Sequence, residues 1–511
     1  MGTPMSTDGH DGGARASTLD LRPGELEELG RAFGQLALEH LREPEALPVF
    51  PETSAEKLKG LFGGGLPAEG VGLEALTGAC AEVFRQSRQN GHPRMFGYVA
   101  SPATPVGAFA SLAAAALNSN VTSWRSAPGP TEIERTAVGW LAELIGFKGE
   151  GLNETCGGLL TSGGSMANLN ALFVAHRAHA HDASRKGLWG ERAPATLYAS
   201  DQIHLSIPKA ADILGLGREQ VRVVPSDERF RVDVRLLRER VEADARAGLR
   251  PFCVVASAGT VSTGAVDPLN EVAGVARAHS LWFHVDGAYG ALAASTESKR
   301  ALFEGLALAD SVSLDPHKWL YTPLGAGCLL FREPERARAA FAGTEEGYIK
   351  VFEREESEAF AFWDYGTELS RPFRALKVWA TLAFYGARRV AAAIEEDCAM
   401  ADYMAGRVGA AEDFELLAPV TLGICCFRYV PAAARRELED EGKREETDAW
   451  LDDLNERVMH RVQRGGQAYV SNATLRGRFA LRASVTNYRT TRRDIDSTLD
   501  SIRRAAREVE G

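Results

Sequence analysis

A lysine in the stretch SLDPHKWLYTPLGAG, residues 313–327, is the side chain whose surroundings first suggest chemistry. Lys318 follows Pro316 and His317 and precedes the apolar run GCLLF by a few residues. An ordinary lysine here would pack its aliphatic stem on Trp319 and extend its charge into solvent. Alternatively, the lysine is a nucleophile whose amine forms an imine with a carbonyl cofactor. The stretch by itself leaves both interpretations open.

Two more polar side chains come at the ends of predicted strands. Asp286 ends the run LWFHVD and is followed at once by small residues, and His204 lies in the turn after the run TLYAS. Ligands of open parallel sheets bind beyond the carboxyl ends of the strands, so both residues are candidate ligand contacts. Asp286 could instead cap the following turn, and His204 could be a packed or exposed histidine.

A glycine-rich turn lies between a predicted strand and a predicted helix in GLLTSGGSMANLNAL, residues 158–172. Gly163, Gly164 and Ser165 would let the backbone approach an anion at the free N–H groups of the helix N-terminus. The turn lacks the Lys-Ser/Thr ending of a P-loop and the GxGxxG spacing. It is therefore either a phosphate cradle of another kind or a tight turn with a serine cap.

Together, these four features predict a site for one cofactor, pyridoxal 5'-phosphate. Lys318 would form the imine, and Asp286 would pair with the pyridine nitrogen and keep it protonated. His204 would stack on the ring, and the glycine-rich turn would hold the phosphate. No single feature requires this cofactor, but this cofactor uses all four.

The hydrophobic pattern indicates the elements that would position these residues. Residues 20–45 and two segments within 54–90 have helical spacing. From about residue 106, helices alternate with short apolar runs, which predicts a mostly parallel sheet covered on both faces. The alanine-rich stretch 106–121 is too interrupted for a membrane span and is expected to be a buried helix. The predicted strands of the sheet are 196–200, 221–225, 252–257, 281–286 and 311–315.

The C-terminal part of the chain is expected to form a smaller α+β domain. Helical patterns resume at 367–410, a long charged helix is expected over 432–464, and strands are expected at 425–430 and 478–485.

Length and composition narrow the class of protein. The chain has 511 residues, 45% of them hydrophobic and 25% charged, so two or three subdomains are expected. The net charge of -11 gives no basic surface for nucleic acid. Residues 1–17 have no apolar core of a secretory signal and are expected to be a disordered leader. Seven scattered cysteines without a CxxC pair favour a reduced, cytoplasmic location. Because no membrane span is predicted, no membrane partner is expected.

The sequence resembles the group II pyridoxal-dependent amino-acid decarboxylases, the family of aromatic-L-amino-acid decarboxylase. The resemblance runs from about residue 20 to the C-terminus and rests on the ordered motifs TSGGSMAN, SDQIHLS, SAGTVSTGAVDPL, HVDGAYG, DPHKW, RPFRALKVW and LRASVTNYRTT. It implies the aspartate-aminotransferase-like α/β fold, fold type I, with a mostly parallel seven-stranded sheet and a small C-terminal domain. It also implies a homodimer with shared active sites. The implied parts are an N-terminal helical segment that clasps the partner, 18–105, a large cofactor-binding domain, 106–390, and a small α+β domain, 391–511.

The resemblance assigns further residues to the cofactor. Gly164 and Ser165 match the family's phosphate-loop positions, and His317 matches the histidine beside the reactive lysine. Ala288 matches the small residue under the ring. Asp315 stands where some relatives carry asparagine, and a carboxylate so near the phosphate would need a donor such as His317.

Two more positions carry functional implications. Thr260 lies near the family's cofactor-contacting threonine, although Val261 replaces a second threonine that some relatives carry. Tyr348 occupies the place of a lid tyrosine that reprotonates Cα, in a Gly- and Glu-rich loop that would order on closure. Relatives with phenylalanine there make an aldehyde, so Tyr348 favours the amine as product. The alternative is an exposed tyrosine without a role.

The resemblance suggests an aromatic substrate. Phe96, Tyr98, Val121 and Trp124 would line an aromatic pocket, partly contributed by the partner subunit, and would favour an aromatic side chain by burial. Ser370 stands where aromatic decarboxylases carry glycine or serine, and serine there is associated with phenolic substrates. The expected reaction is decarboxylation of tyrosine, Dopa, phenylalanine or tryptophan to the amine and CO2.

Several alternatives remain. Arg125 could recruit an acidic side chain, and a glutamate-, diaminobutyrate- or valine-type decarboxylase or an aromatic aldehyde synthase would keep the same family. An aminotransferase or desulfurase would share the lysine and aspartate, and a non-catalytic protein could bind the cofactor without turnover. A metal hydrolase would need clustered ligands. The one dense histidine run, HRAHAHD at 176–182, indicates a solvated helix face, so no metal site is expected.

Overall fold

The computed structural model describes residues 19–147, 157–180, 183–190, 193–342 and 356–510. The chain divides into two compact units, one of residues 1–46 and 53–87 and the other of residues 47–52 and 88–511. The first unit contains three amphipathic helices: α1 (Pro23–Arg42), α2 (Ala55–Phe62) and α3 (Leu73–Arg85). None of them has a fully buried residue, so apolar side chains such as Leu26 are exposed in the single chain.

The second unit is built on a seven-stranded, mostly parallel sheet, as expected. Its strand order is β1-β7-β6-β5-β4-β2-β3, and only β7 runs antiparallel to its two neighbours. The strands are short, apolar and buried, as is typical of a sheet covered by helices. They are β1 (Gly158–Thr161), β2 (Ala195–Ser200), β3 (Val221–Val224), β4 (Arg250–Ser257), β5 (Trp282–Asp286), β6 (Ser311–Leu314) and β7 (Gly327–Phe331).

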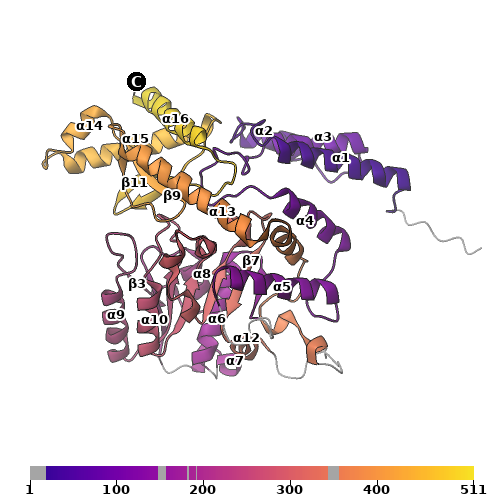
Figure 1. Ribbon diagram of the computed structural model, residues 1–511, viewed down its shortest axis with the longest axis horizontal. Coiled ribbons are helices and arrows are strands. Elements are labelled where there is room, and N and C mark those ends of the chain that lie inside the picture. The colour runs from indigo at the N-terminus through magenta and orange to yellow at the C-terminus, as the bar shows by residue number, and fades with distance from the viewer. Residues whose placement is uncertain (1–18, 148–156, 181–182, 191–192, 343–355, 511) are drawn as a thin grey trace, which may run out of the picture. The chain divides into compact units, whose positions relative to one another are not determined.

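Helices between the strands cover this sheet (Figure 1). The helix that follows β1, α6 (Gly164–His179), contacts five of the strands and is mostly buried. Its N-terminus therefore lies at the carboxyl edge of β1. The other helices of this layer are α5 (Pro128–Leu144), α7 (Ala183–Lys186), α8 (Ser206–Ile213), α9 (Val234–Arg246), α10 (Leu269–Ala278), α11 (Pro316–Trp319) and α12 (Pro334–Phe341).

The long helix α13 (Ala375–Gly409) joins the large sheet to the smaller C-terminal sheet (Figure 1). Gly386 interrupts it with left-handed backbone at φ 73°, a conformation that favours glycine, so it consists of two helical rods. The small sheet is antiparallel, in the order β10-β11-β9-β8. Its strands are β8 (Phe414–Leu416), β9 (Ile424–Tyr429), β10 (Ser471–Leu475) and β11 (Arg478–Ser484), and α16 (Arg492–Glu510) follows them.

The prediction of one charged helix over 432–464 is wrong in one respect, because this segment forms two helices. The first, α14 (Ala432–Glu437), ends before the run LEDEGK, and α15 (Arg444–Arg464) begins after it. Turn hydrogen bonds around Asp440 and Gly442 replace helical ones there. Glycine and clustered acidic residues favour such a break over a continuous helix.

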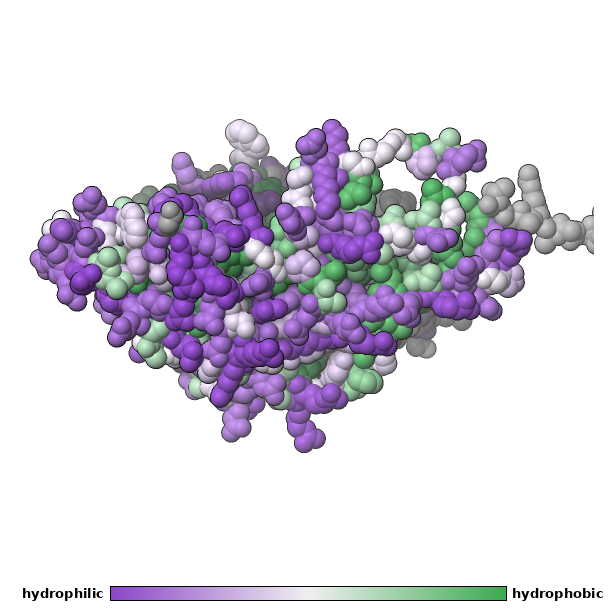
Figure 2. Space-filling model, turned by 90° about the horizontal axis from the view of Figure 1, so that it is seen from above, coloured by the Kyte–Doolittle hydropathy of each residue, from purple (hydrophilic) through white to green (hydrophobic). Residues whose placement is uncertain are grey.

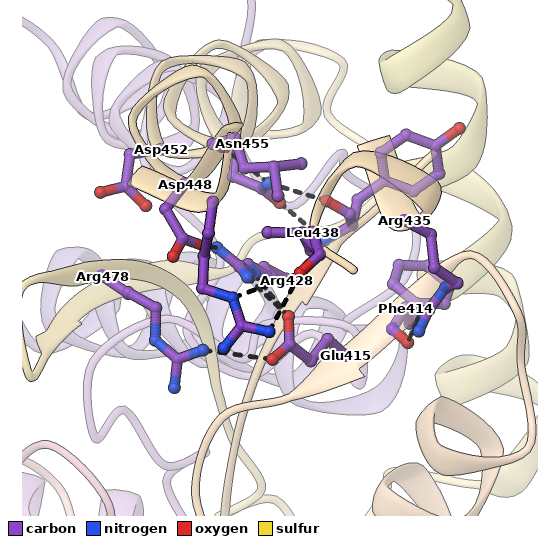
Figure 3. Close-up of polar contacts among 12 residues, drawn as sticks. Phe414, Glu415, Arg428, Arg435, Leu438, Asp448, Asp452, Asn455 and Arg478 are labelled. Carbon is purple, nitrogen blue, oxygen red and sulfur yellow. Dashed lines mark hydrogen bonds and ion pairs between the residues drawn. The ribbon is translucent and has the colours of Figure 1, made fainter. Parts of the chain in front are cut away.

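A buried arginine connects the layers of the small domain (Figure 3). Arg428 on β9 is 1% exposed and forms ion pairs of 2.7 Å with Glu415 of β8 and Asp448 of α15. Beside it, the Asn455 side chain both donates to and accepts from the backbone of Tyr429. These paired polar groups fix the position of α15 on the small sheet.

The alanine-rich segment forms α4 (Pro105–Leu117), but the expectation that it is buried is wrong for the single chain. Gly107 is its one buried residue, while Leu112 is 64% and Leu117 59% exposed. Figure 2 shows that hydrophobic residues reach the surface in patches among the charged ones. Hydrophobicity predicted that this helix is covered, but within this chain its apolar side chains remain exposed.

In the part of the chain that the structure describes, no helix has the length and apolarity to cross a membrane. The six cysteines in that part are free thiols, five of them buried.

An ion pair buried in the core fixes the strand that leads into the glycine-rich turn. Glu134 of α5 pairs with Arg371, and both side chains are 1% exposed. Arg371 also donates to the carbonyls of Val121 and Leu160, each over 2.8 Å, and the Leu160 N–H donates to Glu134. The pair therefore connects α5, β1 and the segment before α13.

We expect the Arg371→Met variant to be destabilised by about 3–5 kcal/mol, because the Glu134 carboxylate stays buried without its cation. The measurement is the thermal unfolding midpoint compared with the wild type. Arg336→Met is the matched control, since Arg336 and Glu333 are about half exposed and such pairs contribute about 0–1 kcal/mol. Equal shifts in the two variants would contradict the stabilising role of the buried pair.

Candidate active site

A cavity of about 690 Å³ lies at the carboxyl edge of the large sheet, and β10 and β11 of the small domain form part of its wall. The strands deliver their terminal residues to this edge because they run parallel. The sequence-predicted residues that line it are Tyr98, Gly163, Gly164, Ser165, His204, Thr260, Asp286, Ala288, His317 and Lys318.

Lys318 lies in the one-turn helix α11, directly after β6. Its Nζ lies 2.8 Å from Asp315 Oδ2, its side chain is 22% exposed, and Asp315 is 2% exposed. Trp319 is fully buried behind it and stacks on Tyr289 with ring centroids 4.9 Å apart. The amine therefore faces the cavity, and the interpretation as an ordinary surface lysine is wrong.

A buried carboxylate on α13 holds the turn that carries Lys318. Trp319 Nε1 and Tyr321 Oη both donate to Asp397 Oδ2, over 2.8 and 2.7 Å. Burial raises the pKa of Asp397 to about 7. The two aromatic side chains on the C-terminal side of Lys318 are thus bound to the second rod of α13, beyond Gly386.

The donor to Asp315 is mainly Lys318 rather than the expected His317. His317 Nε2 lies 3.6 Å from Asp315 Oδ2, and its Nδ1 is occupied by the carbonyl of Ala326 at 2.7 Å. Burial lowers the pKa of His317, which favours the neutral ring. Asp315 Oδ1 is buried and has no hydrogen-bond partner among the described residues.

Asp286 is 8% exposed at the end of β5 and accepts three hydrogen bonds. Asn168 Nδ2 donates to Oδ2 over 2.8 Å, while Ser313 Oγ and the Ala288 N–H donate to Oδ1 over 3.3 and 3.1 Å. The alternative that Asp286 caps the following turn is thus also partly correct, through Ala288. One oxygen edge still faces the cavity, where a protonated ring nitrogen would complete its hydrogen bonding.

His204 lies across the cavity on the segment before α8. Its Nδ1 contacts Ser206 Oγ at 2.8 Å and accepts from the Ser206 N–H over 3.2 Å. Burial lowers the pKa of His204, so the ring is neutral near pH 7. The backbone and side chain of Ser206 thus fix one edge of the ring, and the other edge faces the cavity.

The glycine-rich turn ends in the N-terminus of α6, as expected. A Cβ on Gly164 would lie 2.8 Å from Ala288 Cβ and 3.0 Å from Asp315 Oδ2, closer than real Cβ atoms normally pack. A Cβ on Gly327 of β7 would meet the backbone of Gly163 at 2.6 Å. The turn is therefore tightly enclosed, and the first N–H groups of the 16-residue helix are directed at the cavity.

Thr260 lines the cavity but uses its hydroxyl within its own loop. Its Oγ1 lies 3.0 Å from Thr263 Oγ1 and accepts from the Ala265 N–H. Val261, which replaces a threonine of some relatives, is 38% exposed and lines the same wall with an apolar side chain.

Sequence reasoning missed Arg482, which β11 of the small domain places in the cavity wall. It is 4% exposed, and it donates to the carbonyls of Val261 and Tyr98, each over 2.9 Å. Its Nη2 is buried without a partner among the described residues. Burial lowers the pKa of Arg482, although a guanidinium keeps its charge. The sequence signal was an arginine inside the apolar strand RFALRASV.

Sequence reasoning also missed Asn168, which lies in the second turn of α6. It contacts Asp286 from α6, across more than a hundred residues of sequence. No local pattern identifies such a contact.

Four residues of the expected aromatic wall do not line this chain's cavity. Phe96 is 1% exposed and packs in the core of the small domain, so its assignment to the pocket is wrong. Val121 is fully buried in the core of the large domain. Trp124 is half-buried and Ser370 exposed, both outside the cavity. Of the expected wall, Tyr98 alone lines the cavity of this chain, and Tyr348 lies outside the described residues.

The described part of the histidine run, residues 176–180, is not a solvated face, which corrects the sequence interpretation there. His176 is 4% exposed against Phe252, and His179 contacts the carbonyls of Ala175 and Ser280, each at 2.9 Å. In the described ranges, no group of three or more His, Cys, Asp or Glu side chains is arranged to hold a metal ion.

Comparisons with known proteins agree with this geometry. Residues 56–430 match the family model described as "Pyridoxal-dependent decarboxylase conserved domain". The chain is 33% identical to aromatic-L-amino-acid decarboxylase of Bacillus atrophaeus over 97% of this chain and 98% of that protein. It is 28% identical to phenylacetaldehyde synthase of Petunia hybrida over 94% of each chain. The crystal structure of Oryza sativa TDC with PLP and tryptamine superimposes with a TM-score of 0.87, at 27% identity, over 97% of this chain and all of that chain.

The residues present fit pyridoxal 5'-phosphate. The cavity has a lysine amine, a carboxylate with one oxygen edge open to it, and a glycine-lined helix N-terminus that a side chain would fill. The unpaired Asp315 Oδ1 and Arg482 Nη2 mark its walls as incomplete without a polar ligand.

We expect Gly164→Ala to bind pyridoxal 5'-phosphate about five- to hundredfold more weakly, because the new methyl group overpacks the turn by about 1–3 kcal/mol. The measurement is equilibrium titration of the apo-protein with the cofactor. Gly274→Ala is the control, since a Cβ there on the exposed face of α10 meets nothing within 4 Å. Equal affinities of the two variants would contradict a phosphate site at this turn.

Proposed function

Because the chain belongs to the pyridoxal-dependent decarboxylase family and is a carboxy-lyase that uses pyridoxal phosphate, we propose that it decarboxylates an aromatic L-amino acid to the amine and CO2. The observation that carries the proposal is the single cavity that gathers Lys318, Asp286, His204 and the glycine-rich turn. A rival metal hydrolase would need a ligand cluster, which the described residues lack.

Each of these residues has a proposed role toward the cofactor. When bound, pyridoxal 5'-phosphate withdraws electrons from the Cα of the substrate, so that the bond to its carboxylate can break. Lys318 holds the cofactor covalently through its amine, and Asp286 keeps the ring nitrogen protonated. His204 lies against the ring, with Ala288 as the small residue on the other side.

The phosphate end is held by backbone and by small side chains. The free N–H groups of Gly164 and Ser165, with the positive end of the α6 dipole, bind the phosphate. Gly163 lets the chain approach, and His317 and Thr260 close the site from the side. Asp315 holds the Lys318 ammonium at 2.8 Å before the cofactor arrives.

Arg482 is proposed to bind the substrate. Its guanidinium is fixed by two carbonyls, and its unpaired Nη2 is a ready donor to a carboxylate. A rigid donor of this kind orients the amino acid relative to Lys318, and such positioning contributes a large part of a rate enhancement.

An aromatic side chain fits the wall formed by Tyr98, Val99, Val261 and Leu324. The Tyr98 ring lies 6.0 Å from that of Tyr469, so aromatic surface is available for burial. The relatives named for aromatic decarboxylation support this substrate class. The acidic and aliphatic decarboxylases remain the alternative, with Arg125 as the residue that would favour an acidic substrate.

We further propose a cytoplasmic homodimer. The exposed apolar side chains of α4 and of the first unit support a partner of the same kind, with residues 18–105 as the clasp. Trp124 and Ser370, and a lid carrying Tyr348, would then complete the active site from either subunit.

The first experiment is a substrate panel. We expect CO2 and the amine from L-tyrosine, L-Dopa, L-phenylalanine or L-tryptophan, with little aldehyde or H2O2. In Lys318→Ala we expect loss of the absorbance band of lysine-bound cofactor and a fall in turnover of about a thousandfold or more, as for other nucleophiles. Lys209→Ala, on α8, is the control and should retain both. CO2 only from acidic or aliphatic amino acids would replace the aromatic assignment.

A second variant tests which product forms. We expect Tyr348→Phe to shift product from the amine to the aldehyde, because the phenol that returns a proton to Cα is removed. In that reaction O2 is the two-electron oxidant and becomes H2O2, water supplies the carbonyl oxygen, and the amino group leaves as ammonia. The similarity to phenylacetaldehyde synthase makes this the relevant alternative activity. The measurement is the amine-to-aldehyde ratio in one assay. Aldehyde as the main product of the wild type would reverse the assignment, and an unchanged ratio in the variant would remove the role of Tyr348.

A further inference from the structure

A buried side-chain amide connects two of the residues that face the cofactor. Asn168 on α6 is 1% exposed. Its Nδ2 donates to Asp286 Oδ2 over 2.8 Å and to Ser206 Oγ over 3.0 Å. Both protons of the amide group therefore take part in hydrogen bonds, one with Asp286 and one with Ser206.

The orientation of this amide is fixed from behind. Its Oδ1 lies 3.0 Å from His284 Nε2, and because Oδ1 accepts only, His284 must carry its proton on Nε2. His284 is fully buried in β5, and burial lowers its pKa to about 4, so the ring is neutral. Its Nδ1 then accepts from Ser311 Oγ at 2.9 Å, and the Ser311 carbonyl lies 3.2 Å from the same nitrogen. Ser311 Oγ in turn accepts from Trp282 Nε1 at 2.9 Å.

The donor and acceptor roles at Asn168 also determine those at Ser206 and His204. Ser206 Oγ accepts from Asn168, so its own proton is available for His204 Nδ1 at 2.8 Å. The Ser206 N–H also donates to this nitrogen, over 3.2 Å. A nitrogen that accepts twice carries no proton, so the proton of the neutral His204 ring lies on Nε2.

We propose that Asn168 and His284 are positioning residues that aim the Asp286 carboxylate and hold His204 in the tautomer whose Nε2–H faces the cavity. The Asp286 carboxylate at one end only accepts, and the Trp282 indole N–H at the other end only donates, so the hydrogen bonds run from Trp282 toward Asp286. The proposal rests on the proposed function in assigning Asp286 and His204 to the cofactor.

The network decides what His204 offers to a ligand. With the proton on Nε2, the ring edge toward the cavity is a donor rather than a lone pair. If the Asn168 amide were reversed, an oxygen would face the Asp286 carboxylate, and the two acceptors would repel. The carboxylate therefore fixes the amide from the side of the cavity, and His284 donates to its oxygen from behind.

The direct test is the tautomer of His204 in the apo-protein. Histidine labelled with 15N in a deuterated chain gives long-range correlations that distinguish Nδ1–H from Nε2–H. His204→Gln and His284→Gln each assign one ring by loss of its signals. We expect both rings to be neutral Nε2–H tautomers at pH 7.5. An Nδ1–H or mixed His204 in the wild-type protein would overturn the proposal.

Variants at His284 separate positioning from general stability. In His284→Leu we expect a mixed His204 tautomer and about tenfold weaker binding of pyridoxal 5'-phosphate by the apo-protein, since each lost buried hydrogen bond costs about 1–3 kcal/mol. His284→Gln, whose amide can bond both neighbours, should restore the single tautomer. Thr196→Val is the control, a buried hydroxyl on β2 that contacts Tyr198 instead, and it should bind the cofactor as the wild type does.

Asn168→Asp covers the case in which His284→Leu does not fold, because it keeps the shape and replaces the donor to Asp286 by an acceptor. Weaker cofactor binding in Asn168→Asp than in Thr196→Val would support the proposal. Unchanged binding there, or one retained Nε2–H tautomer in His284→Leu, would overturn it. These measurements need no turnover, so a failed substrate panel would remove the proposed function and leave the tautomer result intact.

Discussion

The Asp286 carboxylate is 8% exposed at the tip of a central strand, and the surrounding elements are arranged to supply its hydrogen bonds. A buried carboxylate without donors is costly, so α6 supplies an amide, β6 a hydroxyl and the following turn an N–H. Each of these elements also carries another site residue. The glycine-rich turn begins α6, and Lys318 follows β6 within a few residues. The elements that supply hydrogen bonds to this one carboxylate therefore also bring most of the other site residues into the cavity.

The parallel direction of the strands explains why short connections suffice to bring the site residues together. Parallel neighbours β4, β5 and β6 end at one edge, so residues distant in sequence arrive together without long loops. Antiparallel β7 inserts between β6 and β1 and brings Gly327 against Gly163. The close contact of the two glycines leaves the glycine-rich turn little freedom to move.

Sequence reasoning succeeded where the signal is local. The strand tips at Asp286 and Lys318 and the strand–turn–helix at Gly163 are short patterns, and the structure brings them into one cavity. It failed where burial depends on a distant surface. Phe96 is an aromatic residue of the kind that lines a substrate pocket, but it is buried in the core of the small domain. The helix α4 is apolar, but it is exposed in this chain. Arg482 and Asn168 were missed as site residues because their partners lie far away in sequence. Such contacts depend on tertiary packing rather than on spacing.

The two rods of α13 have a mechanical consequence. The second rod holds the Lys318 turn through Asp397, and the small domain that follows it supplies Arg482. The turn of Lys318 is also attached to the large sheet, because it follows β6 directly and the Lys318 N–H donates to the Asp315 carbonyl over 2.9 Å. This turn is therefore a joint at which the large sheet and the second rod of α13 meet, and a change that loosens either attachment would alter the position of the reactive amine.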